Sequence, residues 1–134
     1  MCLAIINTTK PKKYTKIQYG YKWMDYSNFY KEFNFPFRAR KNWIKKNEWL
    51  TDNKNTPIFS LFANKNYPTG FHIYLNLDDA MNECNRWYSG VVVKIWFKNV
   101  VAIGKNSKQD IGQTVIAKNM KISKIIYKYK NDRF

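Results

Sequence analysis

The stretch of sequence that decides the fold is residues 91–129, VVVKIWFKNVVAIGKNSKQDIGQTVIAKNMKISKIIYKY. β-Branched and aromatic residues dominate it, and apolar residues alternate with polar ones, which is typical of half-buried strands. A polar segment at 104–112 has the composition of a hairpin tip. Isoleucines and lysines mix in the last strand, so one of its sides should be exposed to solvent and cationic. The expected strands are 91–97, 100–103, 114–117 and 120–129.

A single helix is expected just before this region. Asn76 precedes Leu77 and two aspartates, and such side chains satisfy the free N–H groups of a first turn and favour the positive end of the helix dipole. The helix should cover about residues 77–88 and end at Ser89-Gly90. Its buried face is expected to hold Leu77, Ala80, Met81, Cys84 and Trp87 or Tyr88.

Further strands are expected upstream. The runs 2–6, 14–24 and 71–75 are apolar or alternate, and turn signals bracket another run at 58–63. Residues 25–66 are rich in aromatics but broken by proline, asparagine and lysine. The predicted fold class is therefore α+β, a mostly antiparallel twisted sheet with one clear helix (about residues 77–88) and an irregular aromatic-rich insertion.

Length and composition narrow the class of protein. The 134 residues fit a single domain, 1–134, with the insertion at about 25–66. Hydrophobic residues make up 45% and aromatics 18%, which excludes a disordered cationic tail. We expect no membrane partner and no signal peptide, because no apolar run is long enough for a span. With only two cysteines, the expected location is cytoplasmic, in the host cytoplasm or the virion if the protein is viral.

The net charge of +15 is unevenly distributed. Both ends of the chain are basic and the middle is close to neutral, so one positive face would form if the end segments pair in a sheet. Most of the basic residues are lysines, and AT-rich codon usage would also produce that excess.

Several short motifs carry a family resemblance. Gly20-Tyr21-Lys22, Gly70-Phe71-His72 and the closing 115–122 segment, VIAKNMKI, resemble short uncharacterised proteins of phages, viruses and prophages. Those proteins share a G-[FY]-[KQ] opening, a G-F-H strand before an acidic helix start, and a V-x-A-x-x-[MK]-x-I strand. The resemblance covers about residues 19–126. It implies a fold and a viral setting, and no particular activity.

Catalytic residues are few. His72 is the only histidine, so no zinc cluster can be built on it, and it is either structural or an acid–base or ligand residue. Cys2 follows the initiator methionine, where an N-terminal nucleophile could stand, but a small buried residue is the alternative. Helix-start chemistry explains Asp78 and Asp79, and Glu83 lies one turn further on, where it can face solvent. Paired acid–base work or a divalent-ion site is the alternative for these three carboxylates. We expect no cofactor and no metal.

Basic and aromatic residues interleave in 10–23, 33–43 and 121–134. Aromatic faces stack on bases while cationic groups meet phosphates, although tyrosines and tryptophans in the core beneath surface lysines would give the same pattern. The predicted function is a small basic non-catalytic viral or phage-type protein that binds a polyanion, either nucleic acid or a nucleotide. The candidate binding residues are Lys12, Lys13, Lys16, Arg38, Arg40, Lys121, Lys124, Lys128 and Lys130.

Two alternatives belong to other classes. The chain could be a protein-interaction accessory factor, a host-factor antagonist or virion component, that binds an acidic host protein through Trp43 and Trp49. It could also be a nucleotide-directed enzyme that uses His72.

Overall fold

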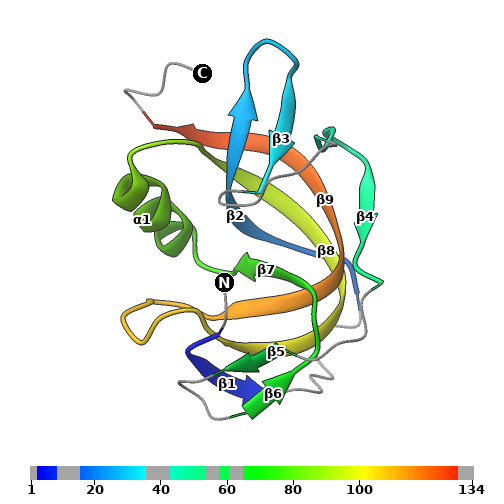
Figure 1. Cartoon of the computed structure of the whole chain (residues 1–134), viewed down its shortest axis with the longest axis vertical. Helices are drawn as coiled ribbons and strands as arrows, with labels where there is room; N and C mark the ends of the chain where they lie inside the picture. Colours follow the sequence, from blue (N-terminus) through cyan, green and yellow to red (C-terminus); the bar gives the residue numbers. More distant parts are fainter. Residues whose placement is uncertain (1–2, 9–15, 36–42, 54–57, 61–64, 130–134) are drawn as a thin grey trace.

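The computed structural model describes residues 3–8, 16–35, 43–53, 58–60 and 65–129. All its strand pairings are antiparallel, and one helix is present in the part described, which confirms the α+β class (Figure 1). No described helix has the length and apolar character needed to cross a membrane. The elements are β1 (Ile5–Thr8), β2 (Gln18–Ser27), β3 (Glu32–Asn34), β4 (Trp49–Thr51), β5 (Ile58–Ser60), β6 (Lys65–Tyr67), β7 (Phe71–Tyr74), α1 (Leu77–Trp87), β8 (Val91–Lys105) and β9 (Thr114–Lys128).

The sheet is built on the long hairpin of β8 and β9, which pair from Val91↔Lys128 to Gly104↔Thr114. The sequence predicted two strands in place of each, and that prediction is wrong. At the expected break, Asn99 takes a left-handed conformation with φ 59°, which asparagine tolerates better than most residues, and its amide donates to Asn119. Irregular register here bends the hairpin without ending its ladder.

The main sheet closes on itself. Its order is β1-β8-β2-β7-β9-β4, with β3 added to β2, and β8 also pairs with β9, so that β8, β2, β7 and β9 form a ring. The contact of β2 with β7 is one register pair, Tyr21↔Tyr74. Gly20 permits this close approach, because a Cβ there would lie 2.6 Å from both the Ile73 side chain and the Tyr74 carbonyl oxygen.

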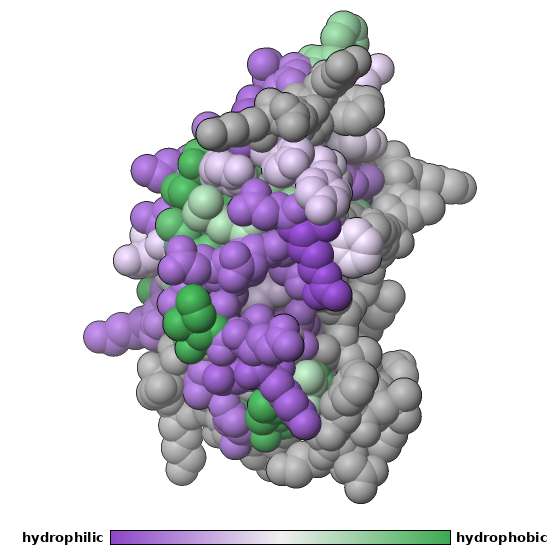
Figure 2. Space-filling model, turned by 90° about the vertical axis from the view of Figure 1, so that its left-hand side faces the viewer, coloured by the Kyte–Doolittle hydropathy of each residue, from purple (hydrophilic) through white to green (hydrophobic). Residues whose placement is uncertain are grey.

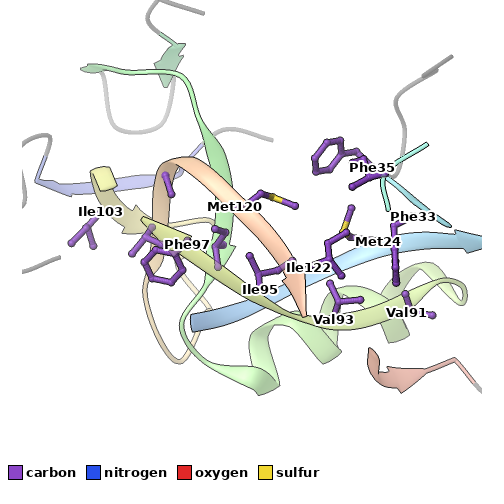
Figure 3. Packing of buried hydrophobic residues seen from close by; sticks show 14 residues of the cluster. Met24, Phe33, Phe35, Val91, Val93, Ile95, Phe97, Ile103, Met120 and Ile122 are labelled. Carbon is purple, nitrogen blue, oxygen red and sulfur yellow. The ribbon is translucent and has the colours of Figure 1, made fainter. Parts of the chain in front are cut away.

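The main core lies on the concave side of this curled sheet (Figure 3). Alternate residues of β8 and β9 point into it and meet side chains from β2, β3 and β7. Phe33, Phe35 and Ile44 join them, so these three residues of the 25–66 region belong to the main core. Two short strands, β5 and β6, form a separate small sheet.

Helix α1 packs on the other side of the sheet and creates a second core of Trp23, Tyr74, Ala80, Cys84 and Val92. Both faces of the sheet are therefore covered at this end, which explains why the three consecutive residues Val91, Val92 and Val93 are all buried.

The caps of α1 follow the sequence closely. The Asn76 side chain accepts from the Asp78 backbone N–H at 2.9 Å, and Tyr88 ends the helix in a left-handed conformation. The prediction that Trp87 or Tyr88 belongs to the buried face of the helix is wrong, because Trp87 is 46% exposed and Tyr88 is 72% exposed. Trp87 instead lies parallel to Trp23 at the rim of the second core.

Asp79 does more than begin the helix. It is 2% exposed, and its two carboxylate oxygens accept from the backbone N–H groups of Ile111 and Gly112, each at 2.8 Å. Hydrogen bonds to a buried charge are stronger than neutral ones. Asp79 therefore fastens α1 to the loop that joins β8 to β9.

Candidate nucleic-acid interface

Aromatic and cationic side chains form a row across four strands of the main sheet. Tyr19 of β2 is opposite Trp96 of β8, Trp96 is opposite Lys121 of β9, and Lys121 is opposite Trp49 of β4. Residues directly opposite each other in antiparallel strands share a face of the sheet. These four side chains therefore lie side by side on the convex face, away from the main core.

Neighbouring rows extend this surface. Tyr21, Lys94 and Lys124 are opposite one another on β2, β8 and β9. Lys98 lies two residues beyond Trp96 and so returns to the same face. We call this surface the cationic–aromatic face, and its members are Tyr19, Tyr21, Trp49, Lys94, Trp96, Lys98, Lys121 and Lys124.

The lysines of the face lie against its rings. The Nζ atoms of Lys98 and Lys121 are 4.3 and 5.0 Å from the centre of the Trp49 ring. The Nζ of Lys94 is 4.4 Å from the Tyr19 ring centre and 4.9 Å from that of Trp96. Such cation–π contacts hold long side chains in place at a stabilisation of about 0.5–1 kcal/mol each at exposed sites.

Negative charge is absent from the two central strands of the face. β8 and β9 together contain seven lysines and no aspartate or glutamate. Among the residues described, no carboxylate forms an ion pair with Lys94, Lys98, Lys121 or Lys124. The positive potential of the face is therefore not neutralised by the protein itself, and it attracts anions.

A hollow of about 450 Å³ opens at the β2 side of the face. The hollow is open to solvent, and polar atoms contribute somewhat more of its surface than apolar ones. Tyr19 and Trp96 meet edge to face at 5.9 Å between ring centres, and Tyr19 and Tyr21 do so at 6.2 Å. Edge-to-face pairs are a preferred arrangement of aromatic rings, so the three rings hold one another in place beside the hollow. The lining residues are Ile17, Gln18, Tyr19, Tyr21, Leu75 and Trp96.

The structure brings together two of the predicted anion-binding residues, Lys121 and Lys124, on this face. Lys128 lies elsewhere: it is opposite the core residue Val91, and its Nζ is 3.2 Å from Asn28 Oδ1 and 5.0 Å from the Tyr26 ring centre. Lys16 is exposed just before β2. The other predicted residues lie outside the described part of the chain: Cys2, Lys12, Lys13, Arg38, Arg40 and Lys130.

The two tryptophans predicted to form a protein interface are both partly exposed. Trp49 is 36% exposed and belongs to the cationic–aromatic face. Trp43 is 40% exposed and precedes Ile44, whose backbone pairs with Phe33. Trp49 therefore lies among lysines, which favours an anionic ligand over an apolar one.

His72 lies on a different surface patch. Its Nε2 is 3.2 Å from the hydroxyl of Tyr67, and that hydroxyl accepts from the Leu3 backbone N–H at 2.8 Å. The imidazole tautomer sets which of the two groups donates in the contact between Tyr67 and His72. These contacts join β7 to Tyr67 and, through its hydroxyl, to the start of the chain.

Helix α1 lies on the same side of the sheet as the cationic–aromatic face, because Tyr21 packs against the second core beneath the helix. Acidic residues gather beside the face, on α1 and on the β8–β9 loop, which lie on one side of the molecule (Figure 1). Burial raises the pKa of the Tyr74 hydroxyl, and nearby Glu83 and Asp110 raise it further. Burial likewise raises the pKa of Asp110, with added repulsion from Asp79 and Glu83. The exterior here is mainly hydrophilic, with small separate hydrophobic areas (Figure 2).

Five members of the face are not among the binding residues predicted from the sequence: Tyr19, Tyr21, Lys94, Trp96 and Lys98. Their signal is present as the alternation Lys94-x-Trp96-x-Lys98, which places all three side chains on one side of a strand. Tyr19 and Tyr21 lie within the basic–aromatic segment 10–23, whereas Lys94, Trp96 and Lys98 lie outside all three such segments.

No family model, no curated protein and no solved structure matches this chain. In the part of the chain that the structure describes, no group of three or more histidine, cysteine or acidic side chains is placed to hold a metal ion. The function is therefore inferred from the geometry and charge of the chain itself.

Proposed function

We propose that this chain is a small basic, non-catalytic protein that binds nucleic acid on its cationic–aromatic face. The observation that carries the proposal is the row Tyr19, Trp96, Lys121 and Trp49, which crosses four strands in register. Lysines flank the row and lack carboxylate partners within the described residues. Charge and aromatic surface are thus combined in one place.

Each component of the face suits one component of nucleic acid. Phosphates are bound by ammonium groups with release of condensed counterions, and bases stack on aromatic rings. A sheet that presents aromatic residues between lysines is one of the common ways to bind single strands. A viral or phage setting, which the sequence resemblance supports, is part of the proposal.

The test is fluorescence anisotropy with purified, nuclease-treated protein and labelled single-stranded and duplex oligonucleotides. Binding is measured from about 50 to 300 mM salt. When phosphate contacts dominate, the logarithm of the binding constant falls linearly with the logarithm of the salt concentration. We expect submicromolar binding at low salt and a clear negative slope. Absence of binding at about 50 mM salt would overturn the proposal.

A protein ligand is distinguished by the same salt series. Capture of an acidic protein that persists at about 0.3–0.5 M salt, without measurable oligonucleotide binding at low salt, would replace nucleic acid with the protein-interaction alternative. Trp49→Ala is informative there, because this side chain belongs to the face and was also predicted to form the protein interface.

A further inference from the structure

The hollow beside Tyr19 and Trp96 differs from the rest of the cationic–aromatic face. Most of the face is a surface of rings and amines, but here an open hollow of about 450 Å³ is bordered by Ile17, Gln18, Tyr19, Tyr21, Leu75 and Trp96. That volume lies within the range of small-ligand pockets, which are lined mainly by apolar and aromatic groups.

We propose that this hollow is a base pocket that receives an unpaired nucleobase of a single strand. This inference rests on the proposed function and deepens it, because a backbone-binding face alone would accept duplex and single strand alike. The pocket adds selectivity for a base that is free to leave its stack.

The chemistry of the lining fits a base. Tyr19 is 51% exposed even with Lys94 Nζ over its ring, and Ile17 is 54% exposed, so both side chains lend exposed surface to the hollow. Edge-to-face packing of Tyr19 against both Tyr21 and Trp96 holds the walls in nearly perpendicular planes. Ring surfaces held in this way are ready to stack with little loss of side-chain freedom.

The cation at the pocket rim fits the phosphate of the same nucleotide. Lys94 Nζ is 4.4 Å from the Tyr19 ring centre and 4.9 Å from that of Trp96, so its charge is at the boundary between the pocket and the lysine rows. The adjoining Lys121 and Lys124 continue the positive surface across β9. A strand whose base enters the pocket therefore has its backbone directed over lysines.

The neighbouring elements fix the pocket. Tyr21 is paired with Lys94 on one side and with Tyr74 on the other, at the closure of the ring of strands. The backbone N–H of Leu75 donates to the carbonyl oxygen of Gln113 at 2.9 Å. The walls thus come from β2, β8 and the segment that leads into α1, all of which are anchored.

The deciding experiment compares three labelled ligands with the unaltered protein: a single strand of about twelve nucleotides, an abasic chain of the same length, and the blunt duplex. Stacking of a base predicts that the abasic chain binds about 5- to 150-fold more weakly, with an unchanged salt slope. Equal affinity for the abasic chain or for the duplex would overturn the pocket and base stacking on the face, and would leave nucleic-acid binding through the phosphates standing. Failure of all three to bind would overturn both.

Variants then locate the effect. Tyr19→Ala should weaken binding of the base-bearing strand at least about 5-fold and leave the abasic chain within about 2-fold, while Tyr19→Phe should bind like the unaltered protein. Tyr30→Ala is the matched control, because Tyr30 is 68% exposed in the turn after β2 and lies outside the face. Equal losses for both ligands in Tyr19→Ala would contradict a base contact.

Discussion

Replacement of Lys98 and Lys121 by glutamine tests whether nucleic-acid binding depends on the charge of the cationic–aromatic face or on the net charge of the whole protein. Both amines lie near the ring of Trp49, at 4.3 and 5.0 Å from its centre. If the four lysines of the face each meet one phosphate of a single strand, the slope of log K against log salt is about −0.7 per contact, or about −2.8 in total. Affinity should then fall about 50-fold between 50 and 200 mM salt.

The double variant Lys98→Gln/Lys121→Gln removes half of these contacts. Its slope should be about −1.4, and its affinity should fall only about 7-fold over the same salt range. Anisotropy with a labelled single strand measures both values. The lost cation–π contacts lower the free energy of unfolding by about 1–2 kcal/mol, so a urea titration must accompany the measurement.

The matched control is Lys108→Gln/Lys128→Gln, which changes the net charge equally. Lys108 is exposed in the β8–β9 loop, and Lys128 lies near Asn28 and Tyr26, away from the face. This variant should keep the unaltered slope. Equal reductions in the two double variants would refute the reasoning, because binding would then depend on total charge.

Three further predictions concern the scaffold. Asp79→Ala should lower the free energy of unfolding by about 3 kcal/mol or more, because two N–H groups of the loop lose a charged acceptor. Asp78→Ala, at an exposed position, should lower it by less than about 1 kcal/mol. Urea titrations measure both values. Gly104→Ala should displace β1 at a cost of about 1–3 kcal/mol, because its Cβ would collide with the Ile5 carbonyl oxygen, and amide exchange in β1 should accelerate. Burial raises the pKa of Tyr74 in the folded protein. The contribution of Tyr74 to stability is therefore complete below its unfolded pKa of about 10 and is lost as the pH rises further. Between about pH 8 and 11, the free energy of unfolding should fall more steeply for the unaltered protein than for Tyr74→Phe, and parallel curves would contradict this.

The elements were largely predictable because local signals agree with the final structure. Asn76 caps α1 as its side chain predicts, and the period-two alternation marks the strands of the second half. Strand continuity was not predictable, because Asn99 sits in a left-handed conformation that the sequence also permits in a turn. Whether such a residue bends a strand or ends it depends on the partner strand, and here Asn119 completes the contact.

The candidate site was predictable in chemistry but not in membership. Lys121, Lys124 and Lys128 look equivalent in the sequence, yet the register is irregular between Val92 and Val93, and Lys128 is opposite a core residue. Lys124 lies on the other side of this irregularity, opposite Lys94 on the cationic–aromatic face. One added residue in a strand reverses every side chain beyond it, and this effect appears only when the pairing is known.

The long hairpin of β8 and β9 also has a consequence for synthesis of the protein. β1, β2, β4 and β7 all precede it in the chain and all find their pairing partners in it, with Ile5 reaching Lys105. Contacts between such distant segments make folding slow. Since chains emerge from the ribosome N-terminus first, the early strands and their aromatic side chains wait for the last third of the sequence before the sheet can assemble. The edges of the early strands therefore stay unpaired until the hairpin has been synthesised.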